Sequence, residues 1–125
     1  MRIDVKKTYK LFIGGEFPRS ESGRSYEVYD AKGNFLANPA LASRKDLRDA
    51  VVSSRGAAEK WEKTSAFNRS QILYRVAEVM QGRAEQFASE IIAQEGLTKS
   101  QAKKQVEKAI DLWVWYSGWC DKIAT

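Results

Sequence analysis

Few side chains in this sequence could take part directly in covalent chemistry. The chain has no histidine and a single cysteine, Cys120. This composition excludes a zinc cluster, a disulfide framework and any Ser-His or Cys-His nucleophile pair within the chain. Cys120 falls toward the C-terminal end of an expected helix, far from the helix N-terminus that activates many catalytic cysteines. We interpret it as a small packing residue, and we assign no catalytic residue and no metal ligand.

A glycine pair, Gly14 and Gly15, is the nearest approach of the sequence to a phosphate-binding loop. Nucleotide-binding folds place such a turn between a strand and a helix, because the pyrophosphate binds backbone amides at the helix start. Here the pair follows one expected strand, and residues 16–18 (Glu-Phe-Pro) read as another extended segment. The pair therefore predicts a hairpin turn, and we assign no cofactor-binding residue.

Acidic side chains recur at helix-surface spacing, as in Glu59 with Glu62 and in Glu85 with Ser89 and Glu90. General acid catalysis by a carboxyl group needs apolar surroundings, and nothing in the sequence places these groups in an apolar pocket. We interpret them as solvated side chains. The sequence therefore contains no complete active site.

Aromatic side chains gather near the C-terminus, where residues 109–122 hold three of the four tryptophans. The cluster consists of Trp113, Trp115, Tyr116 and Trp119. A helix normally gives one face to water, so a helix with aromatic residues on nearly every side is expected to have neighbours all round. We favour packing or an interface for this cluster over a ligand box.

The charge pattern is that of an ordinary protein surface. The net charge is +5, and 43% of the residues are hydrophobic, which argues against disorder. The basic residues are scattered and interrupted by acidic ones, so we expect no binding to nucleic acid and none to membranes. The positions that come nearest to a basic patch are Lys6, Lys7, Lys10, Lys99, Lys103, Lys104 and Lys108.

Because the N-terminus lacks an apolar signal segment, we expect a cytoplasmic protein.

The first third of the chain predicts a small antiparallel β element over residues 1–41. Expected strands cover residues 9–13, 26–30 and 35–37, and the segments between them contain glycine turns. Pro39 closes this part of the chain. We interpret residues 1–125 as one region in which a helical layer over 43–125 follows the β element.

Four helices are expected after Pro39, because the apolar period changes from two to 3.6. Ser43 and Asp46 form a capping box for a helix over about 44–62. Two further helices end near Gly82 and Gly96, with a left-handed cap expected at Gly96. The last helix is expected from Ser100 to about residue 123, with a bend or a close backbone contact at Gly118. The fold class is therefore α+β, dominated by helices.

Several segments together resemble the opening of an aldehyde dehydrogenase. They include residues 11–17 (Leu-Phe-Ile-Gly-Gly-Glu-Phe), 46–51 (Asp-Leu-Arg-Asp-Ala-Val) and 116–122 (Tyr-Ser-Gly-Trp-Cys-Asp-Lys). Arg69, Ile72, Leu73, Arg83, Phe87, Glu95 and Gly96 keep the order and spacing of the family between them. The resemblance implies an N-terminal hairpin and a helical layer, without the nucleotide-binding sheet of the family.

The resemblance implies NAD or NADP as cofactor, and oxidation of an aldehyde to an acid, for a full-length parent. The catalytic cysteine, an oxyanion-binding asparagine and the glutamate base of the family would all lie beyond this sequence. We therefore expect a truncated N-terminal segment that binds no cofactor and is inactive alone. Its partner would be the remainder of an aldehyde dehydrogenase subunit.

The same resemblance suggests that Lys108 and Leu112 lie nearest the substrate channel of the parent, although a plain surface lysine is an open alternative for Lys108. A second functional hypothesis also remains open. The chain could be a non-catalytic interaction module that docks onto a full-length homologue through its aromatic helix, or that self-associates. Either hypothesis requires the aromatic helix to be covered by another polypeptide.

Overall fold

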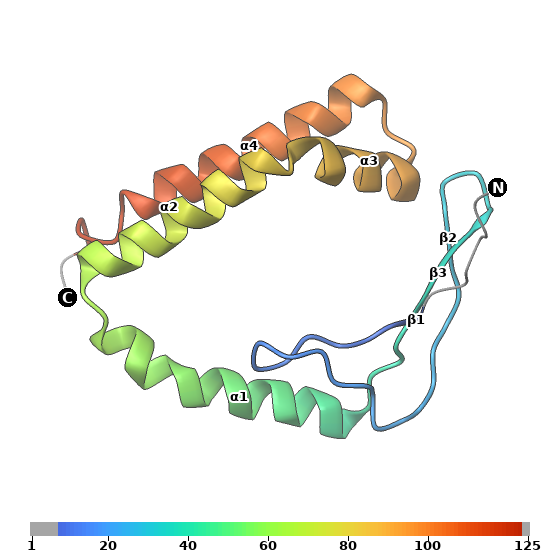
Figure 1. The fold of residues 1–125 in the computed structure, drawn as a ribbon, viewed down its shortest axis with the longest axis horizontal. Coiled ribbons are helices and arrows are strands. Elements are labelled where there is room, and N and C mark those ends of the chain that lie inside the picture. The colour runs from blue at the N-terminus through green and yellow to red at the C-terminus, as the bar shows by residue number, and fades with distance from the viewer. Residues whose placement is uncertain (1–7, 124–125) are drawn as a thin grey trace. The chain divides into compact units, whose positions relative to one another are not determined.

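The computed structural model describes residues 8–123 and contains three short strands followed by four helices. The elements, in chain order, are β1 (Thr8–Tyr9), β2 (Val28–Tyr29), β3 (Phe35–Pro39), α1 (Arg44–Lys63), α2 (Ala66–Gly82), α3 (Ala84–Glu95) and α4 (Lys99–Ser117) (Figure 1). This architecture confirms the α+β class with helices dominating. Contacts divide the chain into two compact units, Met1–Glu59 and Lys60–Thr125.

The first unit contains a three-stranded sheet in the order β1-β3-β2. β2 pairs with β3 in antiparallel fashion, as expected, and Gly33 supplies the left-handed residue of the turn between them (φ +85°). β1 pairs with β3 in parallel, which the sequence analysis did not predict. The expected hairpin around Gly14 and Gly15 is reduced to one bridge, in which Ile13 and Glu16 exchange backbone hydrogen bonds of 3.0 and 3.1 Å.

The capping box predicted at the start of α1 is present. The Ser43 amide donates to Asp46 Oδ2 (2.8 Å), and the Asp46 amide donates to Ser43 Oγ (3.2 Å). Asp46 also receives hydrogen bonds from Ser20 Oγ (2.6 Å) and from the Glu21 amide (3.3 Å). The cap therefore also ties the loop around Ser20 to the start of the helix. The Ser20 hydrogen bond, followed by that of the Ser43 amide, lowers the pKa of Asp46 from 3.8 to about 2.

In the second unit, α4 packs along both α2 and α3, and its C-terminal end lies beside the start of α2 (Figure 1). The most buried apolar residues of these helices are small: Ala77 on α2, and Ala102 and Val106 on α4. Small side chains let two helix backbones approach closely. Trp115 and Tyr116 of α4, in contrast, are more than half exposed.

The ends of α4 differ from the prediction. Its N-cap is Thr98 rather than Ser100, and a capping box joins Thr98 to Gln101 through hydrogen bonds of 3.0 and 3.2 Å. The helix ends at Ser117, and Gly118 is its C-cap instead of an interior bend. Gly96 caps α3 in the left-handed conformation (φ +67°), as predicted.

Replacing Thr98 with alanine is expected to lower the free energy of unfolding by about 1 kcal/mol, because the N-cap hydroxyl and its reciprocal partner are both lost. Thr98→Ser keeps the hydroxyl and should fall within a few tenths of a kcal/mol of the wild type. Urea unfolding followed by far-UV circular dichroism measures both variants. Equal losses for the two would contradict a capping role.

Candidate functional site

The C-terminal half of α4 exposes most of its aromatic surface. Trp115 and Tyr116 are 55% and 56% exposed, and Trp113 and Trp119 are 38% and 39% exposed. The Trp115 ring lies 5.0 Å, centroid to centroid, from both the Tyr116 and the Trp119 rings. Trp115, Tyr116 and Trp119 therefore form one aromatic face with ring contacts, Trp113 lies nearby on the same helix, and the described residues cover the four side chains only in part.

A groove of about 310 Å³ runs beside this face, between α2 and α4. It is lined by Leu73 from α2 and by Ala109, Leu112, Trp113 and Tyr116 from α4. This lining is almost entirely apolar, so the groove can bind an apolar side chain, and it contains no carboxyl, imidazole, amino or thiol group. Trp115 and Trp119 lie on the aromatic face but do not line the groove.

The two residues predicted nearest the substrate channel have different surroundings. Leu112 lines the groove and is 47% exposed. Lys108, one helical turn earlier, is an exposed surface residue. The structure thus brings Leu112 together with the aromatic residues and leaves Lys108 on the surface of α4.

Arg69 on α2 is one of the residues that carry the resemblance to aldehyde dehydrogenases, and no functional role was predicted for it. Its Nε atom is buried and has no hydrogen-bond partner among the described residues. The sequence carried a signal for this feature, because Arg69 precedes the stripe residue Leu73 by four positions and so shares its face of the helix. A charged residue at that place on an apolar stripe is unusual.

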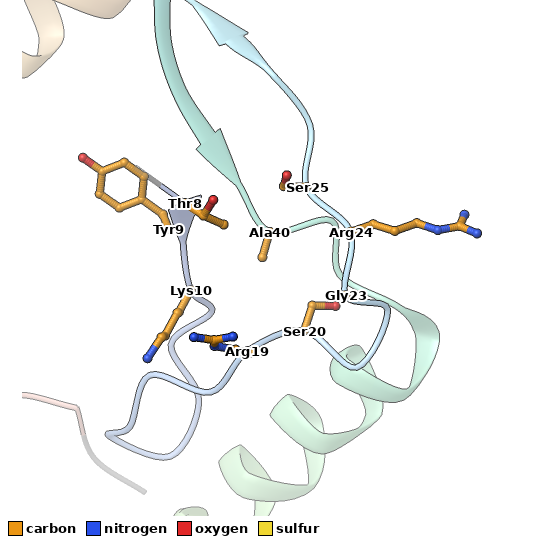
Figure 2. A pocket seen from close by; sticks show the side chains of 9 residues that line it. All are labelled: Thr8, Tyr9, Lys10, Arg19, Ser20, Gly23, Arg24, Ser25 and Ala40. Atoms are coloured by element: carbon orange, nitrogen blue, oxygen red, sulfur yellow. The ribbon is translucent and has the colours of Figure 1, made fainter. Parts of the chain in front are cut away.

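A second cavity, of about 370 Å³, lies in the first unit between β1, the loop 19–25 and Ala40 (Figure 2). Lys10 and Arg19 are among the residues that line it, and the Arg24 side chain points away from the other lining residues (Figure 2). Its lining contains no carboxyl group, no thiol and no imidazole. Since Lys10 and Arg19 are both exposed to solvent, we interpret this cavity as an ordinary basic surface hollow.

Cys120 lies just beyond α4, and its Sγ is 3.8 Å from the Tyr116 carbonyl oxygen. In residues 8–123 no group of three or more histidine, cysteine, aspartate and glutamate side chains is arranged to hold a metal ion. Over that same range, every helix is too short or too polar to cross a bilayer. Lys6 and Lys7, two of the lysines named for the basic patch, lie outside the described residues.

Comparison with known sequences identifies the family. The sequence profile described as "Aldehyde dehydrogenase family" matches residues 17–125. Cytosolic 10-formyltetrahydrofolate dehydrogenase of Pongo abelii is 33% identical over 95% of this chain. Aldehyde dehydrogenase family 2 member B4, mitochondrial, of Arabidopsis thaliana is 31% identical over 97% of it. The chain spans only 14% of the first of these relatives and 23% of the second.

Solved structures agree with this result. The NAD-dependent aldehyde dehydrogenase of Sinorhizobium meliloti superposes with a TM-score of 0.88 at 25% identity, over 95% of this chain and 24% of that one. An NAD-dependent benzaldehyde dehydrogenase of Corynebacterium glutamicum gives a TM-score of 0.85 at 26% identity, over 90% of this chain and 25% of that one. The sequence profile and the folds together show that this chain belongs to the aldehyde dehydrogenase family, of which it represents an N-terminal segment.

Proposed function

We propose that this chain is the N-terminal structural layer of an NAD(P)-dependent aldehyde dehydrogenase and has no catalytic activity by itself. The observation that carries the proposal is the uncovered aromatic face of α4 in a chain that belongs to this family. Burying each large aromatic side chain contributes about 2 to 3 kcal/mol, so such a face favours association with further polypeptide.

The described residues do not fit a nicotinamide cofactor. The Gly14–Gly15 turn leads into Glu16, which bridges back to Ile13, so no helix N-terminus follows the turn to bind a pyrophosphate. In the parent enzyme the cofactor would accept a hydride from the substrate. The residues of this chain would contribute packing and part of the substrate path rather than a redox group.

Two measurements test the proposal. The purified 125-residue chain, mixed with NAD or NADP and a panel of aliphatic and aromatic aldehydes, is expected to form no NADH or NADPH above the blank. The gene after codon 125 is expected to continue in frame with a Pro-Trp-Asn motif and a later Gly-x-Cys motif. Turnover by the purified chain would overturn the claim of inactivity, and an in-frame stop codon would overturn the claim that it is a segment of a longer enzyme.

The uncovered face also favours a second function, that of an interaction module which docks onto a full-length homologue. This function predicts a stoichiometric complex with the homologue, whereas an unassembled enzyme segment should be loosely packed and bind the dye ANS. Size-exclusion chromatography with light scattering, together with ANS fluorescence, separates the two. A monodisperse monomer that binds no ANS would count against both functions.

A cytoplasmic location stays a prediction from the sequence.

We further propose that Lys108 and Leu112 border the aldehyde path of the parent. The position of Leu112 in an apolar groove supports this assignment. In the full-length parent, Leu112→Ala is expected to change the ratio of kcat/KM between a bulky and a small aldehyde by about tenfold, since the three carbons removed from a half-buried leucine correspond to roughly 1 to 2 kcal/mol. Lys108→Ala should alter the preference for charged aldehydes. Unchanged ratios in both variants would remove the assignment.

A further inference from the structure

We draw no further inference here: the strongest candidate, the apolar groove between α2 and α4 with the exposed aromatic face of Trp115, Tyr116 and Trp119 beside it, carries nothing beyond the proposed function, because nothing in residues 8–123 shows what covers it.

Discussion

Replacing Ala102 with leucine is expected to lower the free energy of unfolding of the helical unit by about 3 kcal/mol. Ala102 has no exposed surface at the contact of α4 with its neighbours, and Ala77 on α2 is 2% exposed. A larger side chain there must push two closely packed helices apart, and such overpacking costs roughly 1 to 3 kcal/mol. We expect the upper end of that range because the packed residues include few large side chains that could move aside.

Lys104→Leu is the control for Ala102→Leu, since Lys104 is an exposed residue of the same helix. It adds a similar leucine without overpacking and should change stability by less than about 0.5 kcal/mol. Urea unfolding followed by tryptophan fluorescence measures both. If Ala102→Leu were as stable as the control, the tight packing around Ala102 on α4 would be contradicted.

Replacing Asp46 with asparagine is expected to detach the loop around Ser20 from the start of α1 and to lower the thermal midpoint by an amount on the order of 5 °C. The carboxylate accepts hydrogen bonds from Ser20, from the Glu21 amide and from the Ser43 amide. In asparagine, an NH2 group replaces one of the two carboxylate oxygens, so a hydrogen-bond donor would face the neighbouring N–H or O–H donors that this oxygen accepted from. Asp49→Asn is the control, because Asp49 is exposed and makes only a surface pair with Lys45 at 3.9 Å.

The Asp46 carboxylate also predicts a specific pH dependence. Its pKa is lowered to about 2 in the folded chain, below the unfolded value near 3.8, so its ionised form stabilises the fold. This stabilisation is fully present above about pH 4 and is lost as the pH falls through about 2. The difference in thermal midpoint between the wild type and Asp46→Asn should therefore shrink between pH 4 and pH 2. A difference that stays constant over this range would contradict the low pKa.

Local sequence signals predicted the features that depend on neighbouring residues. The capping box at Ser43 and Asp46 and the left-handed cap at Gly96 were both identified, because each depends on side chains or φ angles within a few positions. The same kind of signal was misjudged at α4. The prediction placed the cap at Ser100, whereas the capping box joins Thr98 to Gln101.

Contacts between residues that are distant in the sequence could not be predicted, because no local pattern indicates the partner. The parallel pairing of β1 with β3 joins Thr8 to Asn38 through a strand of two residues, which is too short to carry an alternating pattern. The hydrogen bond from Ser20 to Asp46 spans 26 positions, and nothing in either residue type indicates the other.

The sequence by itself determined that this chain belongs with aldehyde dehydrogenases, that its helices follow a short β element, and that it lacks histidine and a complete active site. These properties follow from composition and from patterns along the chain. Only the tertiary structure decided which side of α4 is covered, because packing against α2 and α3 buries Ala102 completely and leaves Trp115 55% exposed. It also showed that the Nε atom of Arg69 is buried without an acceptor among residues 8–123, since burial of a single nitrogen depends on how two helices pack and not on their sequence spacing.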